Sequence, residues 1–150
     1  MVFYYPLEYT LMEITDSLSN DIKDAPDWFH SAISQDPRKE NLNHPLGKLA
    51  YQVWDRKDAQ DIILLIHGTG AHKMWWDPIG PLLNNKFSVI APDLPGMGES
   101  DHRNAYNFEE FSEALIAIIN QEKIVSNDKK IYLVGHSLGG HVAGFMASEF

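Results

Sequence analysis

Three short apolar runs constrain the fold of this chain more than any other feature. They cover residues 62–66, 87–91 and 131–134, and each has the length of a β-strand. Strands that are apolar on both faces are typical of parallel sheets covered by helices on both sides. Because stretches with helical spacing separate the three runs, the sequence predicts an α/β fold, a doubly wound and mostly parallel sheet with right-handed crossovers.

Helix signals lie between and after these runs. Residues 74–84 favour a short helix that two prolines interrupt. Asn107, with Glu110 three residues later, is typical of a helix N-cap. Apolar side chains recur at helical spacing after this cap: Phe108, Phe111, Leu115, Ile118 and Ile119. A last helix is expected from Leu138 onward, which completes the alternation of strands and helices.

The first third of the chain carries different patterns. Residues 7–22 have an apolar stripe at helical spacing, and a second, short helix capped by Asp24 or Asp27 is expected after it. Residues 35–47 are charged and rich in turn formers, so they predict a loop. Apolar and other residues alternate over 49–54, which favours a strand.

Composition narrows the classes of function. The chain has 150 residues and a formal net charge of -9, which argues against nucleic acid or an anionic membrane as its main partner. It contains no cysteine, which excludes disulfides and cysteine metal sites and fits a reducing compartment. The acidic residues near the N-terminus do not resemble a secretory signal, and no apolar run is long enough to span a bilayer. A cytoplasmic protein without a membrane span is expected.

The strongest functional signal follows the third apolar run. Residues 135–139 read Gly135-His136-Ser137-Leu138-Gly139, between a predicted strand and a predicted helix. In this setting a sharp turn holds the serine in a strained backbone conformation with its hydroxyl exposed. Because the backbones on either side of the serine approach closely, a Cβ two residues before or after it would clash, and both positions carry glycine.

Two further loops follow the other predicted strands. His67-Gly68-Thr69-Gly70 comes after the first run, and residues 93–100, Asp-Leu-Pro-Gly-Met-Gly-Glu-Ser, come after the second. Ligands of open α/β sheets bind beyond the carboxyl ends of the strands. The sequence therefore predicts that these two loops and the serine turn form one site.

These three motifs, in this order and at these spacings, resemble the α/β-hydrolase family. The resemblance covers residues 48–150, which we interpret as the N-terminal half of an α/β-hydrolase domain. Residues 1–47 are interpreted as a helical and loop extension. The fold expected from the resemblance is a sheet of the α/β-hydrolase type that is incomplete at its C-terminus.

The resemblance implies roles for individual residues. Ser137 would be the nucleophile, and the backbone N–H groups of Leu138 and Thr69 would form the oxyanion hole, with the N–H of Gly70 as the alternative to that of Thr69. The substrate class implied is a small ester or a related acyl compound. Six residues would shape the site: His67, Gly68, Gly70, Gly135, His136 and Gly139.

A complete serine triad also needs an acid and a histidine after the serine. Residues 138–150 offer His141 and Glu149, both on a helix that leads away from the hydroxyl. The chain is therefore expected to be a fragment that lacks both groups. Two alternatives stay open, a non-catalytic binding protein with this fold and a truncated remnant that is inactive alone.

Other chemistries fit the sequence poorly. The dinucleotide pattern that begins at Gly68 fails because Lys73 stands where a third glycine belongs. No cofactor and no metal are expected, and the only partner predicted is a small-molecule substrate. Asp93 is expected to brace its loop, and His67 to make structural hydrogen bonds. Trp75 and Trp76 belong either to an acyl pocket or to the core.

Overall fold

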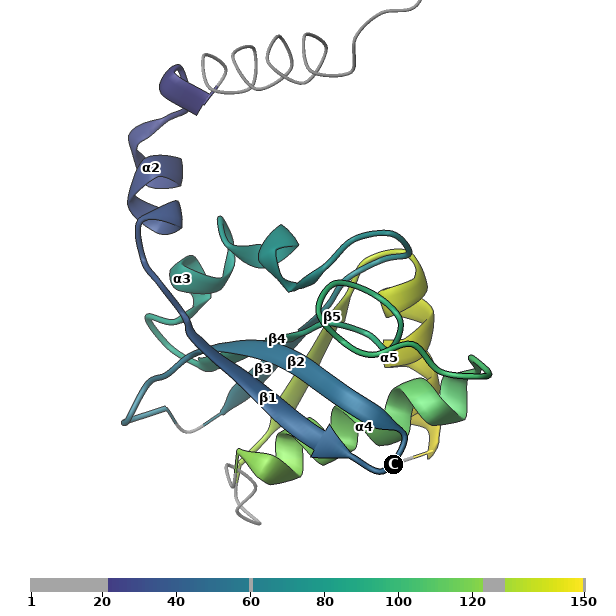
Figure 1. Cartoon of the computed structure of the whole chain (residues 1–150). Coiled ribbons are helices and arrows are strands. Elements are labelled where there is room, and N and C mark those ends of the chain that lie inside the picture. The colour runs from purple at the N-terminus through teal and green to yellow at the C-terminus, as the bar shows by residue number, and fades with distance from the viewer. Residues whose placement is uncertain (1–21, 60, 123–128, 150) are drawn as a thin grey trace, which may run out of the picture. The chain divides into compact units, whose positions relative to one another are not determined.

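The computed structural model describes residues 22–59, 61–122 and 129–149 (Figure 1). The chain divides between Ser31 and Ala32 into two compact units, and the second unit carries the sheet. The helix predicted over 7–22 lies outside the described residues except for its last position. The short helix predicted next is α2 (Asp27–Ile33), which begins at one of the two aspartates proposed as its cap.

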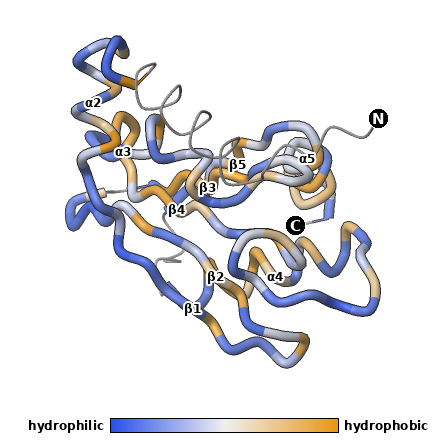
Figure 2. The backbone as a smooth tube through the Cα atoms, turned by 45° about the horizontal axis from the view of Figure 1, so that its top comes forward, coloured by the Kyte–Doolittle hydropathy of each residue, from blue (hydrophilic) through white to orange (hydrophobic). Residues whose placement is uncertain are grey.

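The sheet has five strands in the order β1-β2-β4-β3-β5. Its strands are β1 (Arg38–His44), β2 (Gly47–Trp54), β3 (Ile62–Ile66), β4 (Ser88–Pro92) and β5 (Ile131–Gly135). β3 runs parallel to both β4 and β5, whereas β1 and β2 are antiparallel to their neighbours. The predicted mostly parallel sheet is confirmed, and its three parallel strands are the three apolar runs. Figure 2 shows the hydrophobic stretches of β3 and β4 in the middle of the sheet.

Helices cover both faces of the sheet. On one face α4 (Phe108–Gln121) and α5 (Leu138–Glu149) pack on side chains such as Leu64 and Ile90. On the other face Trp76 and Leu83, from η1 (Lys73–Trp76) and α3 (Gly80–Leu83), pack on Leu65 and Val89. The predicted doubly wound arrangement is therefore confirmed. Asn107 caps α4 as predicted, because its side chain accepts a hydrogen bond from the N–H of Glu110 at 2.7 Å.

The single helix predicted over 74–84 is in fact two short ones, η1 and α3. Pro78 lies between them, where its ring and missing N–H interrupt helical hydrogen bonding. Pro81 lies in the first turn of α3, a position that needs no intrahelical N–H bond. The two prolines therefore act differently: the first separates the helices and the second is compatible with the start of one.

The prediction of a loop over residues 35–47 is wrong. Most of this segment forms β1, which pairs with β2 from Arg38 opposite Val53 to His44 opposite Gly47. β1 is an edge strand, so polar and charged side chains can remain in water while its backbone pairs, and charges are common on such edges. Gly47 has a φ of 120°, which glycine adopts readily and which allows the tight turn between β1 and β2. The division into an extension (1–47) and a hydrolase half (48–150) stays a prediction.

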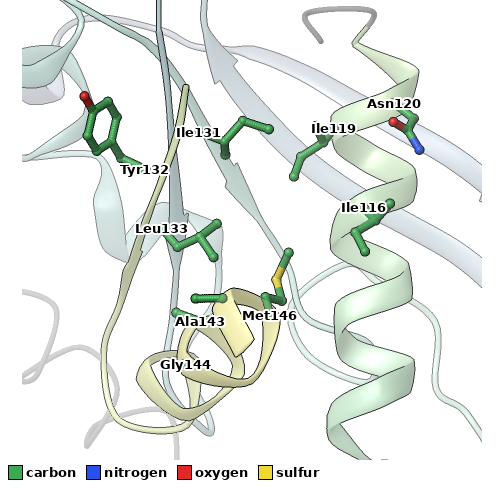
Figure 3. A pocket seen from close by; sticks show the side chains of 10 residues that line it. Ile116, Ile119, Asn120, Ile131, Tyr132, Leu133, Ala143, Gly144 and Met146 are labelled. Carbon is green, nitrogen blue, oxygen red and sulfur yellow. The ribbon is translucent and has the colours of Figure 1, made fainter. Parts of the chain in front are cut away.

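β5 lies at the other end of the sheet. Within the described part of the chain it pairs only with β3. An apolar groove of about 760 Å³ runs beside it, between α4 and α5. Figure 3 shows Ile131 and Leu133 pointing toward α4, whereas Tyr132 points away from it. Among the described residues, one edge of β5 therefore has no partner strand.

Candidate active site

The turn between β5 and α5 holds Ser137 in a rare backbone conformation. Its φ is 53°, a positive value that no other non-glycine residue has in the described part of the chain. Hydrogen bonds fix the turn: the N–H of His136 donates to the carbonyl of Ile66 at 3.0 Å, and the N–H of Gly139 donates to that of His136 at 2.9 Å. The strained serine predicted from the sequence is confirmed, and its side chain is exposed.

The glycines on either side of Ser137 are required by packing. A Cβ at Gly135 would overlap the backbone of Gly139. A Cβ at Gly139 would overlap the backbone carbonyl of Ile66 at the end of β3. The serine turn, residues 135–139 and here termed the elbow, therefore packs closely against its own helix and the neighbouring strand, and both predicted Cβ clashes are confirmed.

A pocket of about 330 Å³ opens beside the serine turn. Its walls come from the loop after β3 and from the turn after β5: Gly68, Thr69, Gly70, Ala71, His72, Trp75, His136 and Ser137. The two segments touch closely, because a Cβ added at Gly68 would lie 3.1 Å from that of Ser137. The structure thus brings together five of the predicted site residues.

The loop after β3 makes a tight turn at this pocket. The N–H of Ala71 donates to the carbonyl of Gly68 at 3.2 Å, and Gly70 has a φ of 73°. A positive φ at the third position of a turn favours glycine, which explains the residue at position 70. Thr69 lies at the exposed tip of this turn. Leu138 is the first residue of α5, so its N–H has no intrahelical partner.

The two tryptophans have separate places. The ring of Trp75 stacks on His136, with 5.8 Å between the ring centroids, and 56% of the residue is exposed. Trp76 is buried in the core beneath the sheet, beside Leu65. Trp75 therefore forms a wall of the pocket, and Trp76 belongs to the core. Of the two predicted alternatives, the pocket therefore applies to Trp75 and the core applies to Trp76.

His67 is fully buried and makes structural hydrogen bonds, as expected. Its Nδ1 lies 2.8 Å from the carbonyl oxygen of Gly68, and its Nε2 accepts a hydrogen bond from the N–H of Leu94 at 3.0 Å. This pairing requires a neutral ring with the proton on Nδ1. Burial, the strongest influence, lowers the pKa of His67 below the ordinary value of 6.5. His67 thus links the loops after β3 and β4.

A second buried link was not predicted from the sequence. The ammonium group of Lys73 lies 2.8 Å from the Asp93 carboxylate and 2.6 Å from that of Glu99. Asp93 braces its loop, as predicted, but the partner is a lysine that composition alone places on the surface. The one sequence signal was its position beside the apolar residues 74–76.

The other histidines near the elbow do not complete a triad within the described residues. His141 Nδ1 lies 3.1 Å from the backbone carbonyl of Ser137, one turn along α5. His72 is exposed at the rim of the pocket. No group of three or more metal-binding side chains is arranged to hold an ion in the described part of the chain. The absence of a metal and of a cofactor stays a prediction.

A family comparison matches this geometry. The profile described as the alpha/beta hydrolase family matches residues 63–148, which include the loop after β3 and the serine turn. This chain belongs to the alpha/beta hydrolase family. The resemblance inferred from the motifs, and the fold class that it implied, are confirmed.

Several proteins are similar to this chain in sequence. A serine hydrolase-like protein of Danio rerio is 32% identical over 71% of this chain and 32% of its own length. A monoacylglycerol lipase of Bos taurus is 30% identical over 73% of this chain and 32% of its own length. An uncharacterized protein of Mycobacterium tuberculosis is 38% identical over 59% of this chain and 25% of its own length. The chain thus spans about a quarter to a third of these relatives.

Solved structures show the same partial coverage. A thioesterase domain from the curacin biosynthetic pathway is 26% identical, with a TM-score of 0.65 over 76% of this chain and 40% of that one. A haloalkane dehalogenase variant from Bradyrhizobium elkanii is 30% identical, with a TM-score of 0.65 over 76% of this chain and 36% of that one. No helix among the described residues has the length and apolar character needed to cross a bilayer.

Proposed function

We propose that this alpha/beta hydrolase cleaves small esters or related acyl compounds with Ser137 as the nucleophile. The observation that carries the proposal is the positive φ of Ser137 at the border of the pocket. Its Oγ would attack the carbonyl carbon of the ester while a histidine takes the hydroxyl proton, and the leaving alkoxide would take up that proton and depart as the alcohol, leaving an acyl-enzyme. Water would then attack the acyl-enzyme, release the carboxylic acid and restore the serine.

The tetrahedral intermediate of each step carries an oxyanion that needs hydrogen-bond donors. We assign this role to the backbone N–H groups of Leu138 and Thr69, with that of Gly70 as the alternative to the Thr69 donor. Leu138 begins a helix, whose N-terminus favours negative charge. Thr69 lines the same pocket as Ser137. Loss of one such donor typically costs about 3–4 kcal/mol of transition-state stabilisation.

The proposal includes an acid and a histidine supplied by sequence beyond residue 150. We infer this from the relatives, of whose length the chain spans 25–43%. On this view the chain is the N-terminal half of an alpha/beta hydrolase domain. The intact mass of the native protein tests it, because a value well above 17.0 kDa is expected. A native mass of 17.0 kDa would contradict this part of the proposal.

The proposed substrate class also agrees with the names of relatives. They include a monoacylglycerol lipase and a pimeloyl-[acyl-carrier protein] methyl ester esterase from Neisseria meningitidis, which is 34% identical over 61% of this chain. Within the described residues, the pocket walls carry no carboxylate, lysine or arginine, which favours an uncharged acyl group. A cytoplasmic location and the lack of nucleic-acid partners stay predictions from composition.

Substitution of Ser137 tests the proposal in the full-length protein. Ser137→Ala should lower kcat/KM for a p-nitrophenyl ester by at least about a thousandfold, because it removes the attacking oxygen. Labelling by an activated phosphonate should disappear in the same variant, and circular dichroism should show an unchanged fold. Ser148→Ala, at an exposed serine of α5, is the matched control and should retain full activity.

Two outcomes would contradict the proposal. Activity of Ser137→Ala within tenfold of the wild-type value would exclude Ser137 as the nucleophile. Failure of the wild-type full-length protein both to hydrolyse esters and to react with the phosphonate would favour a non-catalytic binding protein with this fold.

A further inference from the structure

We infer that Lys73 is a positioning residue that holds the loop carrying the proposed oxyanion donor against Ser137. This segment, residues 67–77 and here termed the oxyanion loop, follows β3, includes η1 and contributes most of the pocket wall. The inference rests on the proposed function, because it assigns Lys73 a task in the same reaction. Lys73 does not line the pocket and acts only through the loop that contains it.

Lys73 fastens the loop through its backbone as well as its side chain. Asp93 accepts hydrogen bonds from the Lys73 N–H at 2.6 Å and from its ammonium group at 2.8 Å. The same carboxylate accepts the N–H of Glu99 at 2.9 Å. The Lys73 carbonyl accepts a hydrogen bond from Nε2 of the buried Gln52 at 3.1 Å. One residue is thus joined to β2 and to the loop after β4.

The three ionised groups, Lys73, Asp93 and Glu99, form what we term the Lys73 cluster. The side chains of Lys73 and Asp93 are 4% and 0% exposed, whereas that of Glu99 is 70% exposed. Burial is the largest single influence on Lys73 and opposes its charge, but its hydrogen bonds and the charges of both carboxylates raise its pKa overall. Without Lys73, the buried Asp93 carboxylate would lose its cation, which is strongly unfavourable.

The cluster and His67 hold the oxyanion loop at two points. His67 is tied to Leu94 near the beginning of the loop, and Lys73 to Asp93 further along. Residues 68–72 lie between these points and all line the pocket. The segment contains two glycines, so its backbone needs such end points to keep one conformation. The position of the Thr69 N–H is therefore set by Lys73.

Lys73 also fixes the position of Trp75, the part of the pocket wall that stacks on the serine turn. Trp75 follows two residues later in η1, and its ring stacks on His136, next to Ser137. A shift of Lys73 would move Trp75 and the 68–72 segment together. A displacement of about 1 Å at a reacting centre can cost about a hundredfold in rate. The cluster is thus placed to affect the transition state more than ground-state binding.

The experiment replaces Lys73 by methionine, which keeps the length of the side chain and removes its charge. In the full-length protein, Lys73→Met should lower kcat for a p-nitrophenyl ester by about 10–100-fold and change KM by less than about threefold, because an oxyanion donor acts mainly in the transition state. Lys73→Arg, which keeps the charge, should recover part of kcat. Lys86→Met, at an exposed lysine, is the matched control.

A second readout is independent of hydrolysis. In the full-length protein, amide hydrogen exchange at Ala71, whose N–H is hydrogen-bonded to the Gly68 carbonyl, should accelerate in Lys73→Met at least about tenfold more than exchange in β3 and β4 does, because the loop opens locally whereas the strands exchange through opening of the fold. If Lys73→Met does not fold, Glu99→Gln removes the exposed half of the cluster and should give the same changes at smaller amplitude. If the wild-type protein does not hydrolyse esters but the loop still exchanges faster in Lys73→Met than in wild type, then Lys73 holds the loop and the proposed function is wrong.

Three results would overturn the inference. The first is a kcat of Lys73→Met within twofold of wild type. The second is a rise in KM that accounts for the whole loss of kcat/KM. The third is hydrogen exchange that increases equally in the loop and in the strands, because Lys73 would then support the fold in general rather than this loop.

Discussion

A Cβ at Gly139 would overlap the backbone of β3, so substitution of this one residue tests how closely the elbow packs on the strand. Gly139→Ala would bring a methyl group into the Ile66 carbonyl, so we expect the free energy of unfolding to fall by about 2–3 kcal/mol. Chemical denaturation measures this change. The backbone of β3 cannot yield without disturbing the middle of the sheet.

Gly144 is a matched control on the same helix. A Cβ there would meet no atom within 4 Å, so Gly144→Ala should raise the free energy of unfolding by about 0.5–1 kcal/mol through helix propensity. Equal effects of the two substitutions would mean that helix propensity, rather than close packing, explains the glycine at position 139.

The buried His67 predicts a dependence of stability on pH. Its pKa is lowered in the folded state, so the unfolded chain binds more protons once the pH falls below about 6.5. Protonation of His67 on unfolding should therefore lower the free energy of unfolding as the pH decreases. In His67→Gln the difference between about pH 7.5 and pH 5.5 should become smaller than in wild type.

Urea denaturation at both pH values checks the His67 prediction. His102→Gln, at an exposed histidine, is the control and should keep the wild-type difference. An unchanged difference in His67→Gln would mean that His67 does not contribute to the acid sensitivity of the fold.

Residue-level prediction from the sequence succeeded where backbone sterics decide. The glycines of the elbow and the strained Ser137 follow from one short motif. Lys73 could not be found in this way, because a lysine is rarely buried unless it is paired, and its buried partner Asp93 lies 20 positions away. Hydrogen-bonded ion pairs of this kind depend on the packing of two loops, which one sequence does not specify.

At the scale of elements, periodicity identified the parallel strands and missed the antiparallel edge. β3 and β4 are apolar because helices and neighbouring strands bury them, and β5 has the same apolar pattern although its Tyr132 and Val134 are exposed among the described residues. Among the described residues, no strand pairs with the outer edge of β1, and its sequence resembles a loop. Arg38 of this strand binds Asp55 at 2.7 Å and Glu122 at 2.6 Å, contacts that tie β1 to the end of β2 and to the end of α4. Those partners again lie far apart along the chain.

At the scale of the whole molecule, the edge at β5 and the net charge have opposite effects on the association of chains. The strand has an unpaired side among the described residues, an apolar groove beside it, and an exposed Val134 on its other face. Such an edge favours association of chains. The charge of -9 opposes it, but salt screens that repulsion over about 10 Å at 0.1 M. Edge pairing acts at contact distance and is screened much less.

We therefore expect the isolated 150-residue chain to self-associate, and more strongly as salt rises from about 0.05 to 0.5 M. Val134→Lys should reduce this association, since a lysine on an edge strand discourages pairing. Leu82→Lys, at an equally exposed apolar residue of α3, is the control and should associate like wild type. Sedimentation velocity measures the species present. A wild-type chain that stays monomeric at every salt concentration would mean that repulsion outweighs the edge, and equal effects of the two lysines would mean that added charge, rather than β5, controls association.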